Sequence, residues 1–179
     1  MSNDRFERWV NASHGLGQME PFIMVPILQG LGRLDCQLMA EGERYRELSE
    51  TEQNAADESV LLSSRITLSY LWILGVYELI RALDKRSSEK SEIFGEDLAI
   101  EIKNYKKEIE RLRMPLAKFE PAKKHPADGP IAYPGLDVAS GDIAWRFQSG
   151  VFVSRTDFSQ KFLILMEELQ NHIFRQQNR

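Results

Sequence analysis

Cysteine and histidine are scarce in this sequence of 179 residues. Cys36 is the single cysteine, and the three histidines, His14, His125 and His172, are far apart. One cysteine forms neither an internal disulfide nor a cysteine-rich zinc site, which favours a reducing compartment. The sequence also has no Gly-x-x-x-x-Gly-Lys-Ser/Thr loop for nucleotide phosphates. We therefore expect a cytoplasmic protein with no metal and no other cofactor.

Long hydrophobic runs are absent as well. The longest apolar stretches, residues 21–31 and 68–80, contain Pro26 and Glu78, and both are shorter than the roughly 18 residues that a membrane span needs. The N-terminal residues lack the basic and apolar segments of a secretory signal. We expect no membrane partner.

What is present is the composition of a globular domain. Hydrophobic residues make up 42% of the chain and charged residues 28%, which is far from the composition of disordered or fibrous proteins. The length suits one domain with one core. We predict a single domain over residues 1–179, with residues 1–20 as an N-terminal extension and residues 119–153 as an inserted loop and hairpin.

Helical periodicity is the main structural signal. Apolar residues recur at intervals of three and four, which places them on one face of a helix. A short helix is also expected at residues 5–10, followed by a linker around Gly15 and Gly17. The four main predicted helices cover about residues 22–48, about residues 53–84, the stripe from Leu98 to Leu116, and Ser154 to the C-terminus.

The segment before the last predicted helix has a different pattern. Residues 119–141 contain four of the seven prolines and predict a long loop. Residues 143–153 alternate between apolar and polar side chains around a Ser-Gly turn, which predicts a β-hairpin. The fold class is therefore all-α: an antiparallel bundle of four main helices, with a proline-rich loop and a small β-hairpin inserted before the last one.

The end of the third helix carries the candidate site. Pro115 is expected to kink or end the helix there. Arg113 and Lys118 are five positions apart, about 140° around an ideal helix, and a kink could turn both toward one pocket. Paired cations suit a phosphate or a carboxylate. The alternative is that both are solvated residues at a helix C-terminus, where positive charge is favourable.

The stretch Arg113-Met-Pro-Leu-Ala-Lys118 resembles the motif of the HEPN superfamily (higher eukaryotes and prokaryotes nucleotide-binding domains). That motif is an arginine, four to six residues and then a histidine. Residues 70–83 and 153–162 are also similar to uncharacterised bacterial members. The resemblance implies a homodimeric helical bundle in which two copies of the motif face each other. In active members the motif cleaves RNA without a metal, and many of these are toxins or phage-defence effectors; other members bind nucleotides, RNA or a partner protein.

The resemblance implies that Arg113 holds a phosphate, whereas Lys118 replaces the family's histidine. A histidine exchanges protons near neutral pH, but a lysine, with a usual pKa near 10.4, stays charged and is a poor general acid–base. We therefore expect a dimeric module that binds RNA, a nucleotide or an antitoxin-type protein partner, in a bacterial defence or toxin–antitoxin setting. One alternative is a metal-independent endoribonuclease that uses Arg113 with Lys118 or His125. The other is a structural oligomerisation domain without a ligand.

Further ligand-binding candidates flank the motif. Arg111, Lys123 and Lys124 add positive charge, and Glu78 either lies at a helix edge or pairs with Arg81, Arg113 or Lys118. Residues 101–125 carry eight basic and four acidic side chains, a net charge of +4, although the chain as a whole has a net charge of -4. The overall charge therefore does not exclude RNA or a nucleotide as the ligand.

Overall fold

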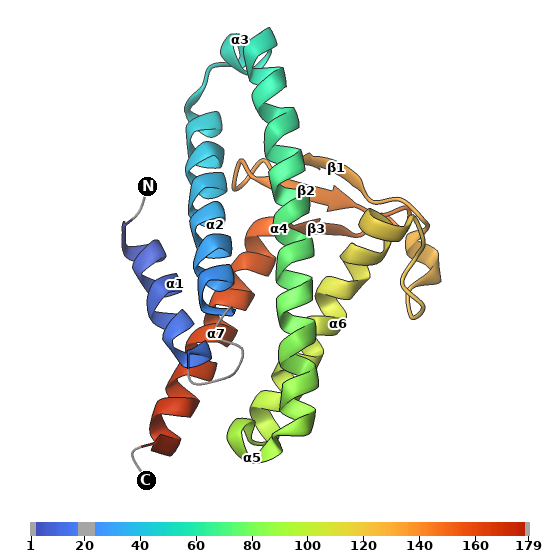
Figure 1. The fold of residues 1–179 in the computed structure, drawn as a ribbon. Coiled ribbons are helices and arrows are strands. Elements are labelled where there is room, and N and C mark those ends of the chain that lie inside the picture. The colour runs from blue at the N-terminus through green and yellow to red at the C-terminus, as the bar shows by residue number, and fades with distance from the viewer. Residues whose placement is uncertain (1–2, 18–23, 178–179) are drawn as a thin grey trace.

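The structure is a computed structural model that describes residues 3–17 and 24–177. In these residues long helices form a bundle, and a small antiparallel sheet packs at one side of it (Figure 1). This confirms the predicted mostly helical fold with a small β-structure before the last helix. The elements are α1 (Asn3–Leu16), α2 (Met24–Glu47), α3 (Glu50–Gln53), α4 (Ala56–Glu89), α5 (Ser91–Phe94), α6 (Glu96–Lys118), a 3-10 turn (Pro126–Asp128), β1 (Tyr133–Leu136), β2 (Ile143–Arg146), β3 (Phe152–Ser154) and α7 (Arg155–Gln177).

The sheet has one strand more than the predicted hairpin. Its order is β1-β2-β3, and both pairs of strands are antiparallel. The additional strand, β1, lies in the predicted loop and contains Pro134. Proline cannot donate to a ladder and is tolerated at a sheet edge, which is where β1 lies. The inner strand β2 buries Ile143 and Trp145 against the helices.

The N-terminal segment is part of the bundle. The predicted short helix and linker form one longer helix, α1, and Trp9 is fully buried with its ring 5.9 Å from that of Phe162 in α7. Gly15 lets the two helices approach closely, because a Cβ there would lie 2.8 Å from the Cα of Gln170. Within the described residues, the proposed extension is therefore a core element. The predicted start of the next helix, at residue 22, lies outside the described residues.

The third main helix continues past its proline. Pro115 is buried inside α6, which ends only at Lys118, and Phe119 follows in the left-handed conformation with φ of 55°. Proline removes one backbone hydrogen bond, but so close to the C-terminus little helix remains to be disrupted. Of the two effects expected of Pro115, a kink or an end of the helix, the second is wrong, because α6 continues to Lys118.

The longest helix, α4, is buried on only one of its faces. Trp72, Ile73, Val76 and Ile80 are fully buried, and α4 packs against α2 and α6. In the described residues α4 is also the one helix that is long and apolar enough to cross a membrane, with a mean hydropathy of 1.4 over 18 residues. This corrects the expectation that no segment is long and apolar enough to cross a membrane. The test is weak evidence for a span, since core helices pass it too.

Candidate functional site

The two cations of the motif point in different directions. The Arg113 guanidinium lies over the ring of Tyr77 in α4, 4.8 Å from its centroid, and its Nη1 is 3.7 Å from the sulfur of Met114. Lys118 is exposed at the end of α6. Because α6 stays helical through Pro115, the two residues keep the separation of about 140° that helical geometry gives. The structure does not bring them into one pocket.

Arg111 is held in the fold. Its Nε and Nη2 donate to the two carboxylate oxygens of Asp128 at 2.6 and 2.8 Å, and its guanidinium lies 5.2 Å from the centroid of the Phe147 ring. The hydroxyl of Ser149 also donates to Asp128. The hydrogen bond from Arg111, opposed by burial, holds the pKa of Asp128 below its usual value. Arg111 therefore attaches the inserted segment to α6.

The other predicted ligand residues lie at the surface. Glu78 is exposed and pairs with Arg81 on the same helix, with Nη2 and the carboxylate oxygen 2.6 Å apart. It does not pair with Arg113 or Lys118. His125 is exposed on the loop after α6, next to Lys123 and Lys124. His125 does not line any of the five best-formed hollows of the described residues.

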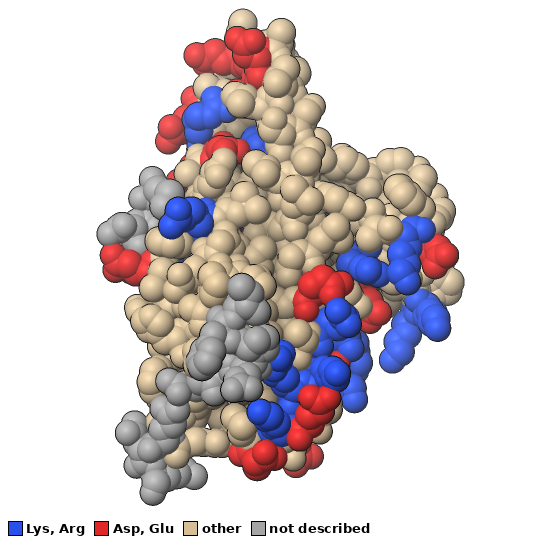
Figure 2. All heavy atoms as spheres, in the orientation of Figure 1, with Lys and Arg blue, Asp and Glu red and all other residues tan. Residues whose placement is uncertain are grey.

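Exposed lysines gather along α6 and the loop that follows it. Figure 2 shows basic side chains over this side of the molecule. The ion pairs and hydrogen bonds of the described residues leave five of these lysines without a partner, whereas Lys106 is paired with Asp84 at 2.6 Å. Phe119, a residue that is 71% exposed, lies between Lys118 and Lys123 in the sequence. We call this surface the basic face; it consists of Lys103, Lys107, Lys118, Phe119, Lys123 and Lys124.

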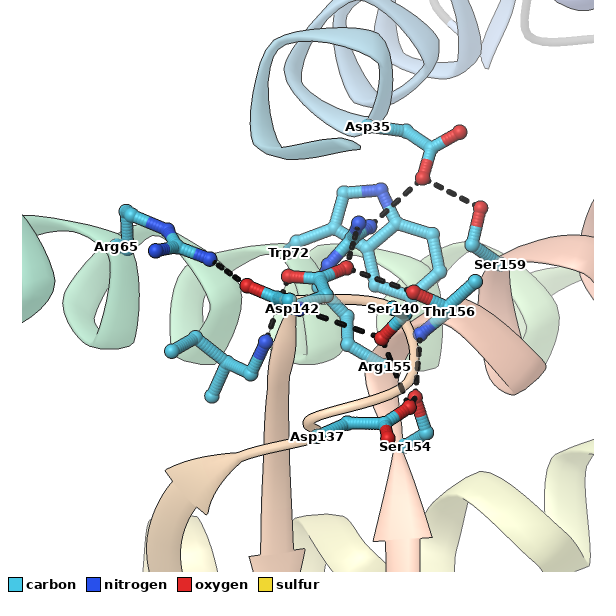
Figure 3. A network of polar contacts seen from close by, with 12 residues as sticks. Asp35, Arg65, Trp72, Asp137, Ser140, Asp142, Ser154, Arg155, Thr156 and Ser159 are labelled. Carbon is cyan, nitrogen blue, oxygen red and sulfur yellow. Dashed lines mark hydrogen bonds and ion pairs between the residues drawn. The ribbon is translucent and has the colours of Figure 1, made fainter. Parts of the chain in front are cut away.

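A buried ionic network lies at the end of the sheet where β2 begins and β3 ends, and the sequence reasoning missed it (Figure 3). Arg155, at the start of α7, is fully buried between Asp35 of α2 and Asp142. Its Nη1 is 2.7 Å from one oxygen of Asp35, and its Nη2 donates to Asp142. Arg5 of α1 binds the second oxygen of Asp35 at 2.7 Å, and Trp9 donates to that same oxygen at 3.0 Å. The network joins α1, α2, α7 and the inserted segment.

The carboxylates of this network are engaged on both oxygens. Burial alone would raise the pKa of Asp35, but the charges of Arg155 and Arg5, with a hydrogen bond from Ser159, hold that pKa below its usual value. In Asp142, one oxygen accepts from Arg155 and Thr156 and the other from a backbone N–H. Neither group has a free oxygen for proton transfer, so the network is structural.

Arg65 is a second buried arginine, and its guanidinium is only partly satisfied. It is 1% exposed, lies over the ring of Tyr45 at 5.4 Å and donates to the carbonyl of Gly141. Its Nε and Nη1 have no hydrogen-bond partner among the described residues. Burial accordingly lowers the pKa of Arg65. Arg65 thus holds the loop before β2 against α4.

One sequence signal pointed to the network. Asp35 lies on the buried stripe of its helix between Leu28 and Leu38, and an acidic residue on an apolar stripe requires a buried partner. That partner, Arg155, is 120 residues away in the chain. Helical periodicity could therefore predict that a partner exists, but not which residue it is.

The described residues contain no group of three or more histidine, cysteine or acidic side chains placed to hold a metal ion. Comparison with known proteins finds no matching family model, no matching curated protein and no matching solved structure.

Proposed function

We propose that the protein is a binding module that holds single-stranded RNA, or a nucleotide, on the basic face. The observation that carries this proposal is the exposed ring of Phe119 between unpartnered lysines. A nucleotide offers a phosphate to a lysine and a base to an aromatic ring, and proteins that bind single strands combine these two contacts. The HEPN resemblance implies the same class of ligand.

The length of the basic face suits a single strand of RNA better than one phosphate group. Lys103 and Lys118 are fifteen positions apart on α6, which corresponds to about 22 Å along the helix axis. The loop that carries Lys123 and Lys124 extends this surface beyond the end of α6. A ligand with several phosphates would therefore contact several lysines at once, and its affinity would fall steeply with salt.

The same geometry favours binding over cleavage. A metal-independent ribonuclease needs a cation on the scissile phosphate and a group that moves a proton nearby. Arg113 lies against Tyr77, and Lys118 is exposed and separate from it. His125 lies on the loop beyond both. An antitoxin-type partner and a bacterial defence setting remain hypotheses that come from the resemblance.

The test measures binding of a fluorescently labelled single-stranded RNA by anisotropy, in EDTA, over a series of salt concentrations. The variant Lys118→Ala/Lys123→Ala/Lys124→Ala should lower the slope of log K against log salt by about 2, since each phosphate contact on a single strand contributes about 0.7. Phe119→Ala should weaken binding by about 5- to 100-fold, the value of one stacked base.

The matched control is Lys161→Ala. Lys161 is exposed on α7 and pairs with Glu108 at 2.7 Å, away from the basic face, and its loss should leave RNA binding unchanged. Failure of the wild type to bind, or equal binding by the triple variant, would refute the proposal.

The same reactions are run on a denaturing gel. Cleavage that disappears in Arg113→Ala would support the ribonuclease alternative instead.

A further inference from the structure

Between residues 59 and 77 the outward-facing surface of α4 carries no charge, and it exposes large apolar side chains among serines and a threonine. Val60, Leu61 and Leu71 are 67%, 46% and 50% exposed. Only 28% of the most apolar 18-residue window of α4 is buried. Arg65, the one charged residue between positions 59 and 77, points inward. A surface of this kind on a globular protein marks an interaction site, because leaving it in water is unfavourable.

Val60 and Leu71 belong to one stripe along the helix, and Leu61 lies beside it. Successive members are three, four or seven positions apart, so they lie within a narrow sector of the helix surface. Acidic residues precede the apolar part, and both signs of charge follow it. Figure 2 shows the uncharged surface over this part of α4, with acidic residues above it and a charged cluster below. The stripe, which we call the α4 stripe, consists of Asp57, Val60, Ser64, Thr67, Leu71, Leu74, Glu78 and Lys85.

We propose that the α4 stripe is the interface between two copies of this chain, packed with their α4 helices antiparallel about a two-fold axis at Leu71. In that arrangement Leu71 packs against Leu71 of the second copy. Asp57, fourteen positions before Leu71, then lies opposite Lys85, fourteen positions after it, and the pair occurs twice. The interface is closed and self-complementary, as a two-fold axis requires.

The charges at the two ends select this arrangement. Asp57 has no ion-pair partner among the described residues, and Lys85 has only Glu89, at 3.6 Å on an exposed surface. A parallel arrangement would place Asp57 against Asp57 and Lys85 against Lys85, which is repulsive. The antiparallel one pairs Asp57 with Lys85 and places the uncharged side chains around Leu71 between these pairs. Glu78, which is paired with Arg81 of its own helix, then lies opposite Ser64.

A lipid bilayer fits the α4 stripe less well. The opposite side of α4 packs against α2 and α6 and carries Glu58 and Arg65, both buried. Spanning a membrane would therefore require the bundle to come apart and these charges to enter lipid. A bilayer surface also has no fixed charges that could pair with Asp57 at one end of the α4 stripe and with Lys85 at the other.

The first test uses cross-linking of the full chain. Leu71→Cys should give a covalent dimer in high yield under mild oxidation, because the two thiols meet at the axis. Ile100→Cys is the control: Ile100 is also 50% exposed but lies on α6, and it should give none. The native Cys36 is 4% exposed and should give no background.

The second test measures mass in solution by light scattering and sedimentation. The wild type should be a dimer at micromolar concentration, and Leu71→Glu a folded monomer by circular dichroism. Lys85→Asp should weaken the dimer about tenfold, because two attractive pairs become repulsive, and Asp57→Lys/Lys85→Asp should restore it. Binding to phosphatidylcholine vesicles is measured for the same proteins.

Three results would overturn the proposal: a monomeric wild type, a Leu71→Glu variant that stays dimeric, or vesicle binding by a monomer that Leu71→Glu abolishes. This interface does not depend on the proposed RNA binding. The basic face is intact in Leu71→Glu, so the two hypotheses can fail separately.

Discussion

Phe119 occupies a position where glycine is the usual residue. Helices commonly end with a left-handed residue, and glycine accepts that conformation without steric cost. Phe119 adopts it with φ of 55° and leaves its ring exposed. Neither burial nor backbone preference explains a phenylalanine there, whereas stacking on a ligand would.

The substitution Phe119→Gly therefore separates stability from function. We expect the free energy of unfolding in urea to rise by about 1 kcal/mol, since a side chain in the left-handed region is unfavourable. RNA binding should weaken at the same time, because the ring is lost. Phe119→Ala is the comparison: it should lose RNA binding without the gain in stability. A Phe119→Gly protein that binds RNA as the wild type does would remove the functional reason for this residue.

Single residues of the candidate site were identified from sequence, but their partners were not. The spacing of Arg113 and Lys118 is visible in the chain, and both lie on α6 as expected. The contact between the guanidinium of Arg113 and the ring of Tyr77 depends on how α4 packs on α6. Local spacing carries no information about such contacts between helices.

Among the secondary-structure elements, periodic ones were predictable and irregular ones were not. The third main helix has a regular apolar stripe, and it forms as expected. Strand β1 has the sequence Tyr-Pro-Gly-Leu, whose proline and glycine are typical of a loop, and it pairs only because β2 lies beside it. The helix α1 extends beyond its predicted end because packing of Trp9 and close contact with α7 stabilise it.

The inserted segment is attached to α6 by the pair of Arg111 and Asp128, and this attachment should depend on pH. The pKa of Asp128 is lowered in the folded state, so its contribution is present above the usual aspartate pKa and is lost as pH falls through the lowered value. Asp128→Asn should reduce the free energy of unfolding at pH 7 by about 1.5–3 kcal/mol, the value of hydrogen bonds to a charged group. Urea unfolding at neutral and acid pH measures both effects.

For the pair of Arg111 and Asp128, the decisive measurement is how the free energy of unfolding changes on acidification. Asp128→Asn should lose less stability than the wild type on acidification, since the titrating group is gone. Glu43→Gln, a change at an exposed carboxylate that has no ion pair within the described residues, serves as the control and should keep the wild-type pH dependence. An Asp128→Asn protein with unchanged stability at neutral pH would show that the attachment contributes nothing.

In the whole molecule, the buried network of Asp35, Arg155 and Asp142 connects parts that are distant in the chain. Arg155 begins α7, Asp35 lies in α2, and Asp142 precedes β2 in the inserted segment. The predicted bundle contains the helices of Asp35 and Arg155, but it did not place the loop of Asp142 against them. The ionic way in which they meet was not predictable, because each residue alone has the pattern of an ordinary helix or loop position.

Arg155→Met tests this connection. It leaves Asp142 without a cation and Asp35 with only Arg5, so we expect a loss of about 3–5 kcal/mol at pH 7, the cost of breaking a buried pair. In the variant, burial should raise the pKa of Asp35 above its usual value. A raised pKa contributes stability at low pH that is lost as pH rises, which is the reverse of the wild type.

The difference in unfolding free energy between the wild type and Arg155→Met should therefore be largest at neutral pH and shrink toward pH 4, about the usual aspartate pKa. Urea unfolding at several pH values measures it. Arg155→Lys keeps the charge and should lose less, and Lys161→Met makes a similar change at an exposed pair and should lose little. A difference that does not vary with pH would mean that Arg155 acts by filling space among its neighbours, such as Trp72, and not by neutralising the two carboxylates.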